Sequence, residues 1–291
     1  MLLDDILVAE REHNKFDISL NHWRRPKPHG LSGCFRLKNE EEFMVRAVES
    51  HLPWLDEAVL MLQDSEDRTL EVAHELKNRW GDKIRIEHYP FVVHPSNTPG
   101  HFSLPENSVY TMMHLTNWAI YKCNYSWIAK IEGDVIALST FSKIRDAVDK
   151  EPDAVRHYGR IGLNIAGEHY DQISYTNPRN AGWDESVFNN DPFWYCVRYG
   201  KWQSINMKEH RDKLINKGFS FLHTKRCKEG LSDPYSCFQA GRLPEIEKWV
   251  PFDRDHTREA LKVHNAVRPH PGPDDFCPDV LFEATILDEY K

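Results

Sequence analysis

Two carboxylates separated by a glycine, Glu132 and Asp134, follow the apolar segment 126–131. If that segment is a strand, residues two apart point to the same side, so both carboxylates leave the same edge of a sheet. Gly133 would let a ligand approach the backbone between them. Mg²⁺ and Mn²⁺ bind carboxylate, water and phosphate oxygens together. The pair therefore predicts a divalent-cation site, and an acidic turn capping a helix near Ser139 is the alternative.

A histidine and two cationic residues follow a second apolar segment late in the chain. His223 ends the segment 219–223, and Lys225 and Arg226 come shortly after it. An imidazole nitrogen is a further ligand for Mn²⁺, and adjacent cations can clamp a diphosphate. The chain contains sixteen histidines, so a structural or solvated histidine is the competing interpretation. We expect His223 to be a ligand of the divalent metal ion, and we expect Lys225 and Arg226 to bind the phosphate groups of a ligand.

The elements that must position these residues are typical of an α/β fold, because short apolar segments alternate with amphipathic ones. The expected strands are 32–37, 57–62, 83–88, 126–131, 154–165 with a break at Gly159, and 219–223. The expected helices are 40–51, 67–80, 107–122, 139–149 and 208–216. Asp67 stands where the N-cap of its helix belongs. The proline-rich stretch 90–105 is expected to be a long surface loop.

The bulk composition indicates a globular protein. The chain has 291 residues, of which 40% are hydrophobic, enough for a full-sized core. No apolar window is long enough to span a membrane and no secretory pattern opens the chain, so we expect a cytoplasmic protein or one at the inner face of a membrane. The six cysteines lack a C-x-x-C pair, which favours reduced thiols. A formal charge of −8 disfavours nucleic acid as a partner and favours a metal ion as the mediator of any phosphate binding.

Three stretches, in this order, resemble the family 2 and related glycosyltransferases of the GT-A fold. They are "RLKNEEEFMVRAVESHLPWLDEAVLMLQDSEDRTLEVAHEL" at 36–76, "WIAKIEGDVIAL" at 127–138 and "AGWDESVFNNDPFWYCVRYGKW" at 181–202. The resemblance implies a Rossmann-like α/β fold with a mixed, mostly parallel sheet flanked by helices. It implies one domain over 1–250, with a nucleotide-binding half at about 32–138, an acceptor half at about 139–250, and a C-terminal extension at 251–291.

The resemblance also implies a metal-bound sugar nucleotide. The E-G-D sequence takes the place of the family's D-x-D motif, so Mn²⁺ or Mg²⁺ is expected on Asp134, Glu132 and His223. The residues expected to contact the donor nucleotide are Asn39, Asp64, Asp67, Arg68, Asn117, Glu132, Lys225 and Arg226. The family usually carries a base-contacting aspartate at the end of the second strand, and this chain has Leu62 and Gln63 there.

A catalytic base is implied by the third stretch. The family's Glu-Asp pair falls on Asn190 and Asp191, so Asp191 is the expected base. Asp184 or Glu185 could instead contact the acceptor or take the base's place. Since Pro192 follows, the competing interpretation is that Asp191 caps a helix.

The expected activity is metal-dependent transfer of a sugar from a UDP- or GDP-type donor to a hydroxyl of a glycan or glycolipid, with inversion. A retaining GT-A transferase is one alternative, and it would not need Asp191 as base. A nucleotidyltransferase is a second, although "SGCFRLKNEEEF" lacks the Gly-rich phosphate loop of that class. A non-catalytic module that binds sugar nucleotides or glycans is a third, because Glu132, Leu62 and Asn190 depart from the family pattern.

Overall fold

The computed structural model describes most of the first half of the chain and short segments of the second. The described residues are 15–137, 141–150, 163–166, 172–175, 186–192, 194–200, 202–205, 221–223 and 248–251. For the strands within 163–175, 221–223 and 248–251, the description covers the backbone alone.

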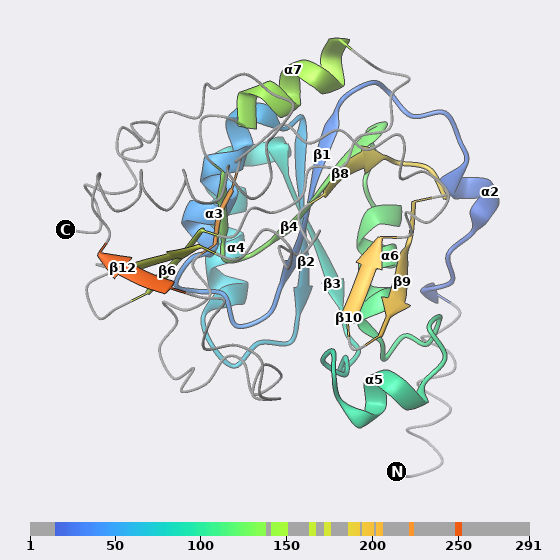
Figure 1. The fold of residues 1–291 in the computed structure, drawn as a ribbon. Helices are drawn as coiled ribbons and strands as arrows, with labels where there is room; N and C mark the ends of the chain where they lie inside the picture. The colour runs from blue at the N-terminus through green and yellow to red at the C-terminus, as the bar shows by residue number, and fades with distance from the viewer. Residues whose placement is uncertain are drawn as a thin grey trace.

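A five-stranded sheet with the order β3-β2-β1-β4-β8 forms the centre of the described structure (Figure 1). Its strands are β1 (Leu31–Leu37), β2 (Glu57–Gln63), β3 (Ile84–Tyr89), β4 (Trp127–Glu132) and β8 (Ser186–Asn189). The first four are parallel, and β8 pairs with β4 in the antiparallel direction. Every residue of β1 and β2 is buried, as expected for parallel strands covered on both faces.

Helices cover both faces of this sheet (Figure 1). On one face lie α3 (Met44–His51) and α4 (Thr69–Trp80), whose apolar side chains pack in one core cluster with Phe35 of β1. On the other face lies α6 (Met112–Tyr121), which packs in a second cluster with Cys34. Successive strand residues point to opposite faces, so β1 contributes to both clusters.

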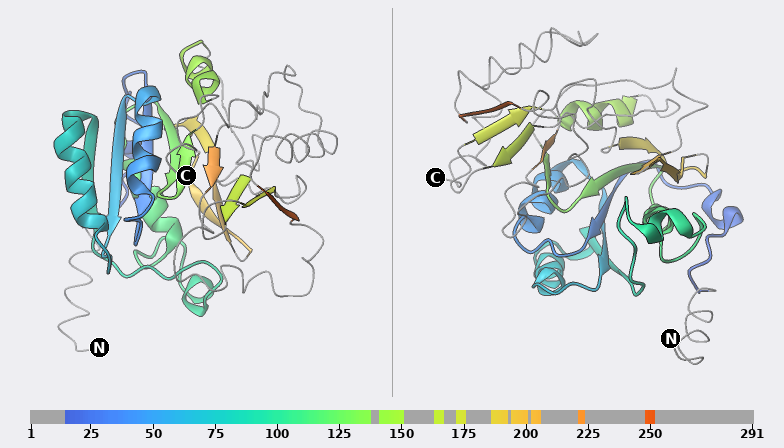
Figure 2. Two further views of the ribbon diagram at one scale, coloured as in Figure 1. Left: turned by 90° about the vertical axis from the view of Figure 1, so that its left-hand side faces the viewer. Right: turned by 60° about the horizontal axis from the view of Figure 1, so that its bottom comes forward.

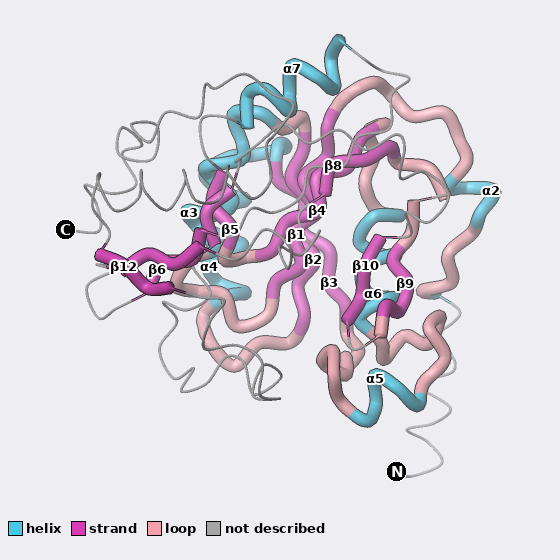
Figure 3. Tube along the Cα trace, in the orientation of Figure 1, coloured by secondary structure: helices cyan, strands magenta, loops and turns pink. Residues whose placement is uncertain are grey.

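A second five-stranded sheet has the order β12-β7-β6-β11-β5, and its edge strand β5 contacts α3 (Figure 3). Its strands are β5 (Val135–Ala137), β6 (Leu163–Ala166), β7 (Gln172–Tyr175), β11 (Phe221–His223) and β12 (Lys248–Pro251). Only two residues separate β4 from β5, so the E-G-D sequence is the point where the chain passes from one sheet to the other. Val135 and Ala137 pack in the same core cluster as α3.

The remaining elements lie around these sheets. They are α2 (Leu20–Trp23), the 3₁₀ turns η1 (Leu52–Trp54) and η2 (Gly81–Lys83), α5 (Pro99–Ser103), α7 (Ser142–Lys150), and the hairpin of β9 (Cys196–Tyr199) and β10 (Trp202–Ile205). α7 lies near the amino-terminal ends of the parallel strands (Figure 2, left), where Arg145 pairs with Asp56 at 2.5 Å.

The expected α/β class and the first four strands are confirmed, whereas several boundaries differ. The helices expected at 40–51, 67–80, 107–122 and 139–149 begin later, at residues 44, 69, 112 and 142. The position that precedes α4 as its N-cap is Arg68, although Asp67 still accepts a hydrogen bond from the N–H of Thr69 at 2.9 Å. The stretch 90–105 is not wholly a loop, because it contains α5.

Three expected elements of the second half fall partly or wholly outside the described residues. Of the strand expected at 154–165, the structure describes residues 163–165, which belong to β6. The strand expected at 219–223 corresponds to β11. The helix expected at 208–216 and the extension 252–291 lie outside the described residues. The division into halves and extension stays a prediction.

None of the described helices has both the length and the apolar character needed to cross a bilayer.

We expect the stability of the fold to depend on pH through His51. The ring lies between Phe35 and Phe141, and its Nδ1 lies 2.6 Å from the carbonyl oxygen of Ala47. Burial lowers the pKa of His51 to about 4. The unfolded chain therefore binds a proton that the native state excludes, and the free energy of unfolding should fall by about 1.4 kcal/mol per pH unit as pH drops from about 6.5 towards 4.

Urea unfolding between pH 7 and pH 4 measures this dependence. His51→Met replaces the titrating imidazole by an apolar side chain. The variant should therefore lose less stability between pH 7 and pH 4 than the wild type. Identical slopes for the two proteins would contradict the assignment.

Candidate functional site

The acidic turn lies at the carboxyl end of β4. β4 ends at Glu132 and β5 begins at Val135, so Gly133 and Asp134 form the connection. Asp134 is buried. Because β5 separates this turn from α7, the alternative that the turn caps the following helix is wrong. The carboxyl ends of parallel strands are where ligands collect in open α/β sheets.

Glu132 forms an ion pair within the main sheet. The register of β1 and β4 places Arg36 beside Glu132, and the Arg36 Nη2 to Glu132 Oε1 distance is 2.9 Å. The Arg36 side chain is 5% exposed and that of Glu132 is 25% exposed. A guanidinium buried to this degree requires a counter-charge, and Glu132 supplies it.

The space beside Gly133 is occupied by the chain itself. A Cβ atom at this position would lie 2.6 Å from Cγ of Glu40 and 2.7 Å from Cδ2 of Leu37. The expectation that the missing side chain leaves room for a ligand is therefore wrong on this side of the turn. The glycine instead lets Glu40, from the loop after β1, pack against the acidic turn.

His223 is brought next to the acidic turn through its backbone. In the antiparallel pairing of β11 with β5, His223 stands opposite Val135, the residue that follows Asp134. β11 also pairs with β6, where His223 stands opposite Asn164. Lys225 and Arg226 lie outside the described residues.

The donor set of this turn fits a divalent cation that a substrate helps to bind. Within the described parts of the chain, no group of three His, Cys, Asp or Glu side chains is arranged to hold a metal ion. Mg²⁺ typically takes one or two protein carboxylates and completes its shell with water and substrate phosphates. Asp134 and Glu132 are the two carboxylates of this turn, and the backbone of His223 stands opposite Val135.

Asn39 and Asp67, both expected at the nucleotide, hold two loops together. Asn39 has a left-handed backbone with φ of 54°, which asparagine tolerates, and its Oδ1 accepts a hydrogen bond from the N–H of Glu66 at 2.9 Å. Asp67 accepts from the N–H groups of Glu41 at 3.1 Å and Thr69 at 2.9 Å. Partial burial raises the pKa of Asp67, but the hydrogen bonds from Thr69 and Glu41 outweigh it, and the pKa lies below its ordinary value.

Asp64 and Arg68 lie on the surface near the same edge. The carboxylate of Asp64, just after β2, is 3.0 Å from Nε2 of His88. Arg68 pairs with Glu71 at 2.9 Å and with Glu75 at 3.4 Å along α4. The structure thus places Asp64 at the carboxyl end of the sheet, as expected, and turns the guanidinium of Arg68 along its own helix.

Asn117 binds the backbone of the β9–β10 hairpin. Its Nδ2 donates to the carbonyl oxygen of Cys196 at 3.0 Å, and its Oδ1 accepts from the N–H of the same residue at 2.6 Å. Both ends of the amide are thereby used to fix the start of β9 on α6. A role at the donor would compete with this contact.

Asp191 lies at the opposite end of β4 from the acidic turn. The antiparallel register pairs Asn189 with Trp127 and Ser186 with Lys130, so Asp191 comes beyond the amino-terminal end of β4. Glu132 lies five residues beyond Trp127 along β4, a distance of about 16 Å in a strand. The structure therefore does not bring Asp191 to the acidic turn. Asp184 and Glu185 lie outside the described residues.

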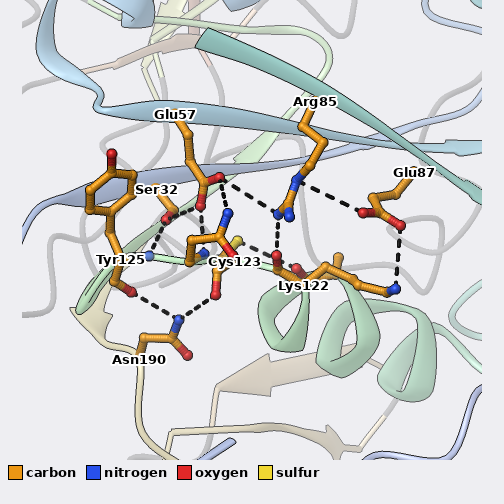
Figure 4. Close-up of polar contacts among 10 residues, drawn as sticks. Ser32, Glu57, Arg85, Glu87, Lys122, Cys123, Tyr125 and Asn190 are labelled. Carbon is orange, nitrogen blue, oxygen red and sulfur yellow. Dashed lines mark hydrogen bonds and ion pairs between the residues drawn. The ribbon is translucent and has the colours of Figure 1, made fainter. Parts of the chain in front are cut away.

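Asn190, the neighbour of Asp191, belongs to a buried polar network (Figure 4). Its Nδ2 donates to the carbonyl oxygens of Cys123 at 3.1 Å and Tyr125 at 2.9 Å. Its Oδ1 accepts from the indole N–H of Trp23 at 2.8 Å. An amide can satisfy all three partners, whereas a carboxylate in its place would face two carbonyl oxygens.

Glu57 organises the rest of this network (Figure 4). Its carboxylate accepts from Ser32 Oγ at 2.7 Å and from the backbone and side-chain N–H groups of Asn124 at 2.6 and 2.9 Å. Arg85 lies 3.6 Å from Glu57 and also pairs with Glu87 at 3.8 Å. These contacts join the amino-terminal ends of β1, β2 and β3 to the segment after α6.

Sequence reasoning missed Arg36, Glu40 and Glu57 as organising residues. The signal for Arg36 was present, because two adjacent parallel strands place their last residues side by side and Arg36 and Glu132 lie near those ends. No sequence pattern pointed to Glu40 beside Gly133, because that contact arises from a loop.

Comparison with known proteins gives similar folds at low identity. No protein-family model matches the chain, and no curated protein matches it significantly. One similar solved structure is S. aureus TarS, with a TM-score of 0.45, 12% identity, and coverage of 67% of this chain and 36% of that chain. Another is S. aureus TarS 1–349 in complex with UDP-GlcNAc, with a TM-score of 0.44, 14% identity, and coverage of 71% and 61%.

A third is glucosyl-3-phosphoglycerate synthase from Mycobacterium tuberculosis in complex with Mn²⁺, UDP and phosphoglyceric acid. Its TM-score is 0.42 at 12% identity, covering 68% of this chain and 76% of that chain. The chain thus spans about a third of the full TarS chain and about three fifths of its fragment. At these TM-scores the similarities say nothing about the function of this chain. Any function is inferred from its own residues.

Asn190→Asp should destabilise the protein, because the substitution replaces a two-donor amide by a carboxylate that faces the carbonyl oxygens of Cys123 and Tyr125. We expect a loss of at least about 3 kcal/mol in the free energy of unfolding at pH 7, and a smaller loss at low pH, where the carboxyl can donate. Urea unfolding measures it.

Asn78→Asp is the matched control, because Asn78 is exposed on α4. It should change stability by less than about 0.5 kcal/mol. Equal effects of the two substitutions would show that the Asn190 contacts do not stabilise the fold.

Proposed function

We propose that the chain is a metal-dependent glycosyltransferase of the GT-A fold that transfers a sugar from a UDP- or GDP-type donor to a hydroxyl of a glycan or glycolipid. The observation that carries the proposal is the position of the E-G-D turn, at the carboxyl end of β4 and at the junction of two sheets. Parallel strands from β1 to β4 end at this edge, and His223 of β11 is in register with the residue after Asp134. The motif order in the sequence supports the same function.

Asp134 of the turn and His223 of β11 would hold Mn²⁺ or Mg²⁺, and Glu132, which is paired with Arg36, would act through a bound water. Such a cation supplies Lewis-acid neutralisation of the charge that develops on a diphosphate leaving group. The burial of Asp134 strengthens its electrostatic interactions, because water screens them less. Lys225 and Arg226, which follow His223 in the chain, are proposed as donors to the diphosphate.

The acceptor hydroxyl must lose its proton to a nearby carboxylate in an inverting reaction. Because β8 directs Asp191 to the other end of β4, we favour Asp184 or Glu185 as the base. Both precede Ser186, which pairs with Lys130 only two residues before Glu132. The remoteness of Asp191 also favours the retaining transferase as the second candidate, since that reaction needs no such base.

The proposal predicts that UDP or GDP protects the protein against thermal unfolding when Mn²⁺ is present. At a hundred times its dissociation constant, a ligand that binds only the native state adds about 2.7 kcal/mol to the free energy of unfolding. Asp134→Asn should abolish the metal-dependent part. Asp82→Asn, at a fully exposed position far along the chain from the turn, is the control and should retain it.

Two results would contradict the proposal. One is a wild-type protein that no nucleoside diphosphate protects with either metal. The other is full metal-dependent protection in Asp134→Asn. Protection without hydrolysis or transfer of any sugar nucleotide, on a broad acceptor panel, would instead identify a binding module.

The same preparations separate the reaction types. We expect sugar transfer to be lost in either Asp184→Asn or Glu185→Gln. It should be retained in Asp191→Asn. NMR of the product gives the anomeric configuration, and retention of configuration with all three variants active would identify a retaining enzyme. Loss of transfer in Asp191→Asn with unchanged donor binding would restore Asp191 as the base.

A further inference from the structure

Two buried side chains near α5 carry nitrogen atoms that no other described residue satisfies. His101, on α5, is 1% exposed, and neither of its ring nitrogens makes a hydrogen bond. The carbonyl oxygen of Gly200 lies near the ring but outside hydrogen-bonding geometry. The Nε of Arg198, on β9, is also buried and without a partner. Unsatisfied buried groups of this kind mark places where a water or an ion completes the structure.

Arg198 and His101 are neighbours because Arg198 binds the end of α5. Its Nη2 donates to the carbonyl oxygen of Leu104, the C-cap residue of this helix, at 2.6 Å. His101 lies three residues earlier in the same short helix. Burial and the positive charge of Arg198 lower the pKa of His101, so the imidazole is neutral at pH 7 and offers one N–H donor.

The charge of Arg198 is not compensated within the described part of the chain. The carbonyl oxygen of Leu104 takes one of the five N–H donors of the guanidinium, and no carboxylate of the described residues pairs with it. By contrast, each of the partly or fully buried Arg36, Arg85 and Arg145 pairs with an aspartate or glutamate. A helix cap alone would therefore leave Arg198 with an unsatisfied donor and an unpaired charge.

These groups lie at the same end of the main sheet as the acidic turn. α5 belongs to the connection from the carboxyl end of β3 to α6 and lies next to the β9–β10 hairpin (Figure 1). Arg198 stands opposite Gln203 in the hairpin, and opposite residues project to the same face. In its best hydrogen-bonding orientation, the Gln203 amide oxygen lies 2.8 Å from Nη1 of Arg36, the partner of Glu132. Two side chains, those of Gln203 and Arg36, thus lie between Arg198 and Glu132.

An oxyanion meets the needs of these groups together. Phosphate and carboxylate oxygens accept hydrogen bonds from guanidinium and imidazole N–H groups, and they supply the missing negative charge. A water molecule would satisfy the donors and leave the charge of Arg198 unpaired. The diphosphate of the donor is assigned to the cation at the acidic turn, so an anion at Arg198 belongs to the other substrate.

We propose that Arg198 and His101 form a binding site for an anionic group, a phosphate or a carboxylate, of the acceptor. Arg198 supplies the charge and its Nε–H, and His101 supplies a neutral N–H. The assignment to the acceptor rests on the proposed function, whereas the anion site itself does not. The inference narrows the acceptor from any glycan or glycolipid to hydroxyl compounds that carry a negative charge.

Inorganic phosphate, added without metal or nucleotide, tests the anion site. NMR of the arginine Nε–H groups in ¹⁵N-labelled protein reports on it, and the signal that disappears in Arg198→Lys identifies Arg198. In the wild type this signal should shift and saturate as phosphate is added, while the signal of the exposed Arg25 stays in place. An Arg198 signal that does not respond would overturn the site and identify a bound water as the partner.

Calorimetric titration with phosphate measures the contribution of each residue. Arg198→Gln should weaken phosphate binding at least about tenfold and His101→Phe at least about threefold, because charge-assisted hydrogen bonds are the stronger ones. Arg25→Gln is the matched control and should stay within about twofold. Equal losses in Arg25→Gln and Arg198→Gln would indicate a general effect of surface charge and overturn the site. The wild-type NMR titration decides even if a variant does not fold.

Sugar transfer to matched acceptors tests the second part of the proposal. With a UDP-sugar donor and Mn²⁺, we expect glucose 6-phosphate or glucuronate to be used at least about tenfold better in kcat/KM than neutral glucose. Comparison of the first two separates phosphate from carboxylate. Arg198→Gln should remove the preference by raising KM for the charged acceptor, with KM for the donor unchanged.

Equal use of charged and neutral acceptors would overturn the assignment to the acceptor. Failure of this inference is distinguishable from failure of the proposed function. A protein that binds phosphate at Arg198 and transfers no sugar would keep the anion site and contradict the transferase. A protein that transfers sugar without a phosphate response at Arg198 would do the reverse.

Discussion

The ion pair between Arg36 and Glu132 is the interaction on which the carboxyl end of the main sheet depends. It joins Arg36, the next-to-last residue of β1, to Glu132, the last residue of β4, and reaches α6 through Thr116. Directly after Glu132 the chain leaves this sheet and enters the second one. The pair therefore lies directly before the point at which Asp134 and β5 leave the main sheet.

The two ends of the parallel strands carry different kinds of polar residues. At the amino-terminal end, Glu57 and Asn190 bind backbone groups and neighbouring side chains within the fold (Figure 4). At the carboxyl end, Glu132 and Asp134 lie at a turn between two sheets. The buried network accounts for the asparagine at 190, since only an amide fits its partners, and it explains why the segment around Asp191 supports structure in this chain.

The sequence predicted the four parallel strands of the main sheet well, because β1, β2 and β4 are mostly apolar, β3 alternates, and α3 and α4 carry a periodic apolar face. It could not predict the second sheet in full, since strands of three or four residues such as β5 give little periodic signal. It also did not predict β8, whose antiparallel register decides which end of β4 Asp191 occupies. Site residues such as Asn39, Asp67 and Asn117 were ambiguous for a physical reason: the side chains that bind ligands also bind backbone groups at loops and helix ends.

A crystal structure of the protein with Mn²⁺ and UDP, in which anomalous scattering locates the manganese, tests the central claim most directly. The predicted result is manganese coordinated by Asp134 and by diphosphate oxygens, with the Glu132 carboxylate still paired to Arg36. Manganese and diphosphate bound away from residues 132–134, or bound directly by a Glu132 that has left Arg36, would contradict it.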